Sequence, residues 1–189
     1  MSKAYVFLAD GFEEIEGLTV VDILRRAGIE VCTTSIMGRE QIAGAHKIEV
    51  KADAKFADCD FSGGDLFVLP GGMPGTRYLG EYEPLCSLLK EKDQQGIYLA
   101  AICAAPSVLG DLGLLKGRKA ICYPGFEDRL AGAEVTFEKV VTDGHITTSM
   151  GMGTAIPFAL RLVELLCGAE KALEIKKSIR YGHLSELKK

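Results

Sequence analysis

The segment GIYLAAICAAPSVLGD, residues 96–111, decides the fold, because it predicts a buried strand that runs directly into a helix. Residues 97–102 form a nearly unbroken apolar run, which is typical of a strand covered by helices on both faces. Pro106 is tolerated only in the first turn of a helix, where its missing N–H would have no partner. The helix is therefore expected to begin near residue 104, which places Cys103 at the junction.

A cysteine at such a junction is a candidate nucleophile. The N-terminus of a helix carries about half a positive charge and unpaired backbone N–H groups, and both favour the thiolate. The small side chains of Ala104 and Ala105 would leave room for a substrate beside the sulfur. The alternative is that Cys103 is a small buried apolar residue without a chemical role, as free cysteines often are. This segment alone favours neither interpretation.

The rest of the chain alternates between predicted strands and predicted helices. Further strands are predicted at residues 3–9, 29–36, 65–69, 119–122, 134–141 and 146–149. Further helices are predicted at residues 14–26, 83–95, 154–166 and 169–179. This alternation predicts one α/β domain over residues 1–189, with a doubly wound, mostly parallel sheet and helices on both faces. Residues 41–50 are predicted to form a small antiparallel hairpin.

Acidic residues follow the first predicted strand. In a doubly wound sheet the functional site lies at the carboxyl ends of the strands, where residues 10–16, residues 70–75 and Cys103 should meet. Burial would raise the pKa of the Glu16 carboxyl, which could then exchange a proton with the sulfur. The alternative is that Glu16 and its acidic neighbours only complement the positive end of the helix dipole.

Two glycines follow the strand at residues 65–69. Glycine permits a close approach of the backbone, so the N–H of the Gly71-Gly72 turn could join that of Ala104 in an oxyanion hole. Such a hole would stabilise the negative oxygen of a carbonyl group attacked by Cys103. The alternative is an ordinary tight turn without a chemical role.

No histidine is placed beside Cys103 by the sequence. The chain has three histidines, and His46 lies in the predicted hairpin, His145 beside a turn and His183 near the C-terminus. We expect the last two to be solvated. A Cys–His dyad of the papain type therefore has no evident base.

Composition excludes several functional classes. A net charge of −4 argues against nucleic acid as the main partner. No apolar run reaches the roughly 18 residues of a membrane span, and the first residues lack the pattern of a signal peptide, so we expect a cytoplasmic protein. Phosphate-binding loop motifs are absent, which argues against a nucleotide-binding function.

The cysteines do not predict a metal site. The six cysteines form no C-x-x-C motif or Cys/His cluster, so neither a metal nor another cofactor is expected. Cys32, Cys122 and Cys167 are predicted to be buried and inert, since they lie in apolar patterns. Cys59 and Cys86 are predicted to be more exposed.

Three motifs together resemble a known family. DGFEEIE (residues 10–16), VLPGG (68–72) and AAICAAP (100–106), in this order and spacing, resemble the ThiJ/PfpI superfamily. The resemblance is strongest to its DJ-one-like branch, which includes a parkinsonism-associated protein deglycase. VDILRRAG (21–28) and TSMGMGTAIPFAL (148–160) extend the similarity over most of the chain.

This resemblance implies a fold, an assembly and a site. It implies a flavodoxin-like domain, similar to the class I glutamine amidotransferases, that forms a homodimer and needs no cofactor. Cys103 would be the reactive cysteine, Glu16 its protonated partner, and Gly72 and Ala104 the oxyanion donors. The activities of the family are conversion of methylglyoxal to lactate, repair of early glycation adducts, and oxidative-stress sensing through a cysteine sulfinate.

The chain departs from the family pattern at two positions. The protease-like branch has a histidine directly after the cysteine, where this chain has Ala104, and this disfavours a peptidase or an amidotransferase. The deglycase branch often has a histidine near the cysteine, in the strand-end segment where this chain reads Cys122-Tyr123-Pro124, and Tyr123 is the polar residue there. That tyrosine could donate a hydrogen bond as an auxiliary group, but a phenol with an ordinary pKa near 10 is a poor base.

Two functions therefore remain open. The first is a cysteine-dependent glyoxalase or deglycase that acts on α-oxoaldehydes or early glycation adducts and is linked to oxidative stress. The second is a non-enzymatic redox sensor or chaperone that works through oxidation of Cys103. The accessible junction and the glycines favour the enzyme, whereas the missing histidine favours the sensor.

Overall fold

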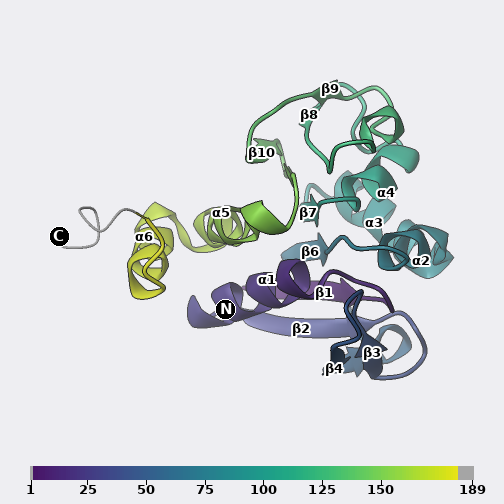
Figure 1. Ribbon diagram of the computed structural model, residues 1–189, viewed down its shortest axis with the longest axis horizontal. Coiled ribbons are helices and arrows are strands. Elements are labelled where there is room, and N and C mark those ends of the chain that lie inside the picture. The colour runs from purple at the N-terminus through teal and green to yellow at the C-terminus, as the bar shows by residue number, and fades with distance from the viewer. Residues whose placement is uncertain (1, 183–189) are drawn as a thin grey trace.

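A seven-stranded sheet forms the centre of the computed structural model, which describes residues 2–182 (Figure 1). Its strand order is β10-β11-β7-β6-β1-β2-β5. Neighbouring strands are parallel except for β10 and β11, which form an antiparallel hairpin. The bounds are β1 Lys3–Leu8, β2 Glu30–Ser35, β5 Ala54–Lys55, β6 Leu66–Leu69, β7 Tyr98–Ile102, β10 Val140–Asp143 and β11 Ile146–Ser149.

Helices cover both faces of this sheet, as predicted. On one face lie α1 (Glu14–Arg26) and α5 (Ala155–Cys167), with α6 (Ala169–Ser178) packed on α5. On the other face lie α2 (Gly75–Glu81), α3 (Glu83–Gln94) and α4 (Pro106–Asp111). Among the described residues, no helix combines the length and apolar character needed to cross a membrane.

Strand β1 shows how the sequence generates the two layers. Side chains of a strand point alternately to opposite faces. Ala4, Val6 and Leu8 therefore enter the apolar cluster beneath α1 and α5, whereas Tyr5 and Phe7 enter the cluster beneath α3 and α4. All five residues are buried, so β1 is central and apolar on both sides.

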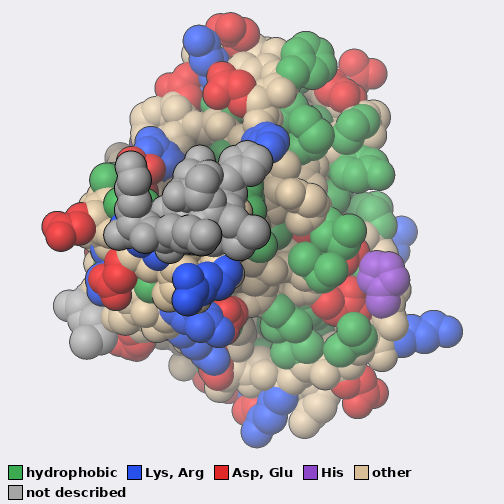
Figure 2. Space-filling view, turned by 60° about the vertical axis from the view of Figure 1, so that its left-hand side comes forward, with side chains coloured by type: hydrophobic (Ala, Val, Ile, Leu, Met, Phe, Trp, Pro, Cys, Tyr) green, Lys and Arg blue, Asp and Glu red, His purple; other side chains and the backbone are tan. Residues whose placement is uncertain are grey.

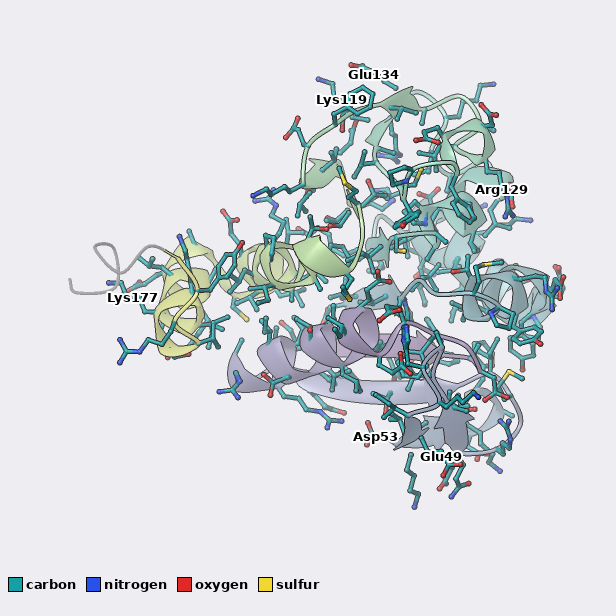
Figure 3. All side chains as sticks on the ribbon, in the orientation of Figure 1. Glu49, Asp53, Lys119, Arg129, Glu134 and Lys177 are labelled. Atoms are coloured by element: carbon teal, nitrogen blue, oxygen red, sulfur yellow. The ribbon has the colours of Figure 1, made fainter. Side chains whose placement is uncertain are left out.

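Within residues 2–182, two small sheets and three short 3₁₀ helices accompany the central sheet. The predicted hairpin is confirmed, with β3 (Gln41–Ala43) antiparallel to β4 (Glu49–Lys51). Strands β8 (Lys119–Ala120) and β9 (Glu134–Val135) form a separate parallel pair, marked by Lys119 and Glu134 in Figure 3. The 3₁₀ helices are η1 Phe56–Asp58, η2 Glu127–Arg129 and η3 Met152–Thr154.

Several predicted elements differ from the structure. The strand predicted at 119–122 ends at Ala120 and stays outside the central sheet, because the next N–H, that of Ile121, donates to the Thr148 hydroxyl. The strand predicted at 134–141 is divided into β9 and β10, and between them the chain leaves the ladder, with Phe137 exposed. Helix α2 was not predicted, because its proline- and glycine-rich start is typical of a turn.

The strand order brings three loops to one edge. Strands β7, β6 and β1 are parallel neighbours, so their carboxyl ends lie side by side. The chain passes from β1 to β2 on one side and returns to β6 on the other, which makes this edge a topological switch point. The segments that begin at Asp10, Pro70 and Cys103 therefore meet there, as the sequence predicts.

Candidate active site

Cys103 follows β7 directly and has an unusual backbone conformation. Its φ angle is +65°, in the left-handed region that residues other than glycine rarely adopt. The N–H of Cys103 donates to the Ser149 carbonyl at 3.0 Å, and its own carbonyl accepts the Tyr123 N–H at 2.7 Å. Bonds to two neighbouring segments thus hold a conformation that costs energy, as is common at functional sites. Helix α4 begins at Pro106, two residues later than predicted.

Glu16 is the third residue of α1, and its carboxyl group is directed into the protein. Only 1% of the residue is exposed, so it does more than complement the helix dipole at the surface. One oxygen, Oε2, accepts the Gly71 N–H at 2.9 Å, and the carboxyl group lies beside the Cys103 side chain, close enough to raise the pKa of the thiol. The other oxygen, Oε1, is buried and has no partner among the described residues.

Backbone amides surround the sulfur. The N–H groups of Gly72 and Ala104 lie close enough to the Cys103 side chain to lower the pKa of its thiol, so both predicted oxyanion donors are near the reacting atom. The N–H of Gly71 is not available for this purpose, because it binds Glu16. A sulfur with two converging amides and one carboxyl group is suited to attack on a carbonyl carbon.

The pKa values of the pair do not follow the sequence prediction. Burial raises the pKa of Glu16 from 4.5 to about 7, in the expected direction. Burial and then the Glu16 charge raise the pKa of Cys103 to about 12, so the predicted lowering at the helix end is wrong. The Ala104 and Gly72 amides lower this pKa, but by less than the other two effects raise it. The thiolate therefore forms most readily when Glu16 carries a proton.

Gly71 permits the contact between α1 and Cys103. A Cβ atom at this position would lie 2.5 Å from Cys103 Cβ and 2.6 Å from Glu16 Oε2. We expect Gly71→Ala to separate the two side chains and to cost about 1–3 kcal/mol of stability. Thermal unfolding and the alkylation rate of Cys103 measure both effects. The matched control is Gly63→Ala, since a Cβ at Gly63 meets nothing within 4 Å; equal losses in the two variants would contradict this prediction.

Gly151 precedes a predicted helix, and the structure also places it beside Glu16 and Tyr123. A Cβ atom there would lie 3.3 Å from Tyr123 Cδ2 and 3.9 Å from Glu16 Oε1, so this glycine lies between the two side chains. The half-exposed Tyr123 ring is thereby placed at the border of the site. The sequence contains one sign of this position, because Gly151 follows β11 by two residues and β11 pairs with β7, the strand that ends just before Cys103.

The described histidines bind acidic residues elsewhere. His46 Nδ1 lies 2.9 Å from Glu14 Oε2 and 3.6 Å from Glu13 Oε2. His145 Nε2 lies 2.8 Å from Asp93 Oδ1, with its side chain only 18% exposed, so the predicted full solvation is wrong. His183 lies outside the described residues.

One group of side chains has the composition of a cation site. Potential ligand atoms of Glu13, Glu14 and His46 all lie within 4.8 Å of one another. The two carboxylates raise the pKa of His46, chiefly through the hydrogen bond to Glu14. Within this cluster, protonated His46 therefore acts as the cation that pairs with the carboxylates of Glu13 and Glu14.

Comparison with known proteins identifies the family. Residues 2–165 match the model of the DJ-1/PfpI family. The chain belongs to this family. Within the family, the oxidized DJ-1 of Toxoplasma gondii has a similar solved structure, with 37% sequence identity and a TM-score of 0.93. The similarity covers 97% of this chain and 100% of that one.

Curated members of the DJ-1/PfpI family differ in length. Protein DJ-1 homolog B of Arabidopsis thaliana is 41% identical over 175 residues, which are 92% of this chain but 40% of that protein. The chain therefore spans less than half of that relative. The glutathione-independent glyoxalase DJR-1.2 of Caenorhabditis elegans is 32% identical over 169 residues, 88% of this chain and 89% of that protein.

Proposed function

We propose that this protein is a cofactor-independent glyoxalase-type enzyme, a hydrolase or lyase that uses Cys103 to convert α-oxoaldehydes or early glycation adducts. The observation that carries the proposal is the contact between the Cys103 sulfur, the buried Glu16 carboxyl and the amides of Gly72 and Ala104. The family relative named a glutathione-independent glyoxalase supports it.

The proposed reaction is redox-neutral. The Cys103 sulfur adds to the aldehyde carbon of methylglyoxal, its proton passes to Glu16, and the carbonyl oxygen becomes an oxyanion held by the Gly72 and Ala104 amides. Glu16 protonates this oxygen and then moves the proton from the former aldehyde carbon to the neighbouring carbon. The hydroxyl proton passes to the oxygen of that neighbouring carbon, which leaves a lactoyl thioester. Water hydrolyses the thioester, releasing lactate and restoring the thiol. One methylglyoxal and one water thus give one lactate.

The environment of Glu16 suits a residue that both accepts and donates protons. A general acid–base group works best when its pKa lies near the working pH, and burial raises the pKa of Glu16 to about 7. The carboxylate form accepts the thiol proton, which matters because the pKa of Cys103 itself is raised to about 12.

A turnover assay tests the proposal. Purified protein is incubated with excess methylglyoxal without glutathione, and lactate is measured over time. We expect many equivalents of lactate per protein. Consumption of one equivalent, with Cys103 left modified and no lactate released, would overturn the proposal.

The second candidate function is redox sensing at the same cysteine. The unpartnered Oε1 of Glu16 favours it, because a protonated carboxyl group could donate a hydrogen bond to a sulfinate oxygen at Cys103. We then expect mild peroxide to add two oxygen atoms selectively at Cys103, and Glu16→Ala to weaken this selectivity. Peptide mass mapping that shows even oxidation of all six cysteines would count against a sensor.

We also propose that the protein forms a homodimer through an apolar face on α1 and the β3–β4 hairpin. Ile15, Leu18 and Ile48 are exposed there and line one groove with Ile156 and Ile179. Figure 2 shows apolar side chains gathered along one side of the surface. Apolar patches of this kind are typical of protein interfaces.

We expect Ile48→Asp to convert this dimer into a monomer, because the substitution places a charge in an interface that excludes water. Ile48 is 55% exposed in the single chain, so the monomer should still fold. Light scattering should give twice 20.4 kDa for the natural protein and 20.4 kDa for the variant. Phe137→Asp, on the exposed segment before β10, is the control that should remain dimeric. A natural protein of 20.4 kDa would refute the dimer.

A further inference from the structure

Cys32 and Cys59 form a second thiol group, apart from Cys103. Cys32 lies in β2 and Cys59 directly follows η1, and both are partly buried in the apolar cluster beneath α3 and α4. Cys103 packs against the cluster on the opposite face, and two strands separate β2 from β7. The sequence predicted Cys32 to be buried and Cys59 to be exposed, and the fold instead gives them similar surroundings.

The two sulfurs share one hydrogen-bonding partner. Cys32 Sγ lies 3.6 Å from the Thr34 hydroxyl oxygen, and Cys59 Sγ lies 3.8 Å from the same atom. The two thiols are also close enough for Cys32 to contribute to the raised pKa of Cys59. Cys32 and Thr34 are two residues apart in a strand, so both point to the face where Cys59 lies. These contacts place the sulfurs side by side.

The fold holds the Cys59 segment against β2. Strand β5 pairs with β2 in parallel, and Asp53, just before β5 and labelled in Figure 3, accepts hydrogen bonds from the N–H and the hydroxyl of Thr33. Cys59 Sγ donates to the Lys55 carbonyl at 3.4 Å. The approach of the two sulfurs to the same hydroxyl group thus follows from sheet pairing.

We propose that Cys32 and Cys59 are a redox site that a hydroperoxide oxidises to a reversible disulfide. In the first step the Cys32 thiolate attacks one peroxide oxygen, the O–O bond breaks, and the released hydroxide takes up the former thiol proton as water. In the second step the Cys59 sulfur attacks the sulfenic sulfur, the S–O bond breaks, and the hydroxyl group leaves with the Cys59 proton as a second water. Two thiols lose two electrons and hydrogen peroxide gains them.

The surroundings of the two cysteines suit Cys32 as the thiol that attacks the peroxide and Cys59 as the thiol that then forms the disulfide. Burial raises the pKa of Cys59, so this thiol retains the proton that leaves in the second step. The rings of Phe56 and Phe61 lie in contact within the same apolar cluster. A neighbouring thiol held in place traps the sulfenic acid before a second peroxide oxidises it further. A small molecular oxidant, restored by a dithiol reductant, fits this partly buried site.

Peptide mapping tests the proposal in protein that carries Cys103→Ser, so the outcome does not depend on the proposed glyoxalase. The protein is treated with one equivalent of hydrogen peroxide, alkylated and digested with trypsin without reduction. Peptides 27–39 and 56–77 each contain one cysteine. We expect a linked product that weighs two hydrogen atoms less than their sum and that dithiothreitol cleaves. We also expect the Tm to rise by about 5 °C or more, because the disulfide closes a loop of about 28 residues.

Two variants in the same background serve as controls. Cys59→Ser should lose the linked peptide while keeping the Tm of the reduced protein within a few degrees. Cys86→Ser removes a buried thiol that donates to the Gly80 carbonyl, and it should retain the linked peptide. Recovery of both peptides separately alkylated, or oxidation that occurs first at the exposed Cys167, would overturn the proposal.

Discussion

Replacing Cys103 by alanine should lower kcat/KM for methylglyoxal by at least about 10³-fold, because the proposed reaction passes through a thioester on this sulfur. No other described cysteine contacts Glu16, so a different thiol cannot take over the role. Alanine retains a Cβ atom at the unusual φ of +65°, and the backbone strain should therefore stay nearly the same. Lactate formation measured over a range of substrate concentrations gives the value.

Two further variants separate chemistry from folding. Cys167→Ala removes an exposed thiol at the end of α5 and should retain full turnover. Cys103→Ser retains a hydroxyl group near Glu16, but a hydroxyl ionises far less readily than a thiol, so its activity should remain close to that of the alanine variant. Turnover by Cys103→Ala equal to that of the natural protein, with an unchanged Tm, would rule out the mechanism.

Glu16→Gln should lower kcat by about 10²–10³-fold, because it removes the group that moves the proton between the two carbon atoms. Glutamine can preserve the Gly71 hydrogen bond through its carbonyl oxygen, so the shape of the site should change little. The pKa of about 7 also predicts that kcat/KM of the natural protein rises with pH through this value, as the carboxylate that accepts the thiol proton forms. Measurements of kcat/KM from pH 5 to 9 should show this rise in the natural protein and its loss in the variant.

The same residue should make stability depend on pH. The pKa of Glu16 is about 7 in the folded protein and near 4.5 in the unfolded chain. Folding therefore carries no ionisation cost below pH 4.5, and the cost grows as the pH rises through 7, to about 3 kcal/mol. Glutamine carries no charge, so Glu16→Gln should gain about 3 kcal/mol relative to the natural protein between pH 4 and pH 8. Urea unfolding at both pH values measures this gain, and parallel curves for the two proteins would refute it.

The location of the site followed from local patterns. A continuous apolar run ending at Ile102 and a proline at position 106 require a strand-to-helix junction at Cys103, whatever surrounds it. The apolar spacing after Glu13 likewise defines α1, whose bounds agree with the prediction. Parallel strands align their carboxyl ends, so these local elements suffice to bring Glu16 towards Cys103.

The pKa of Cys103, in contrast, depends on segments that are far apart in the chain. A helix end predicts a lowered pKa for Cys103, but the actual direction depends on how much water the surrounding segments exclude and on the Glu16 charge. The border formed by Gly151 and Tyr123 similarly requires β11 to lie beside β7. Local propensity contains no information about either effect.

The sequence by itself determined the α/β class, the strand–helix junction and the candidate pair of Cys103 and Glu16, because each depends on periodicity and turn chemistry within a few residues. Only the tertiary structure decided the burial of that pair, the bonding of His46 to Glu14 and the approach of Cys32 to Cys59. These features join residues separated by tens of positions, and the pairing and packing of whole strands and helices determine their distances.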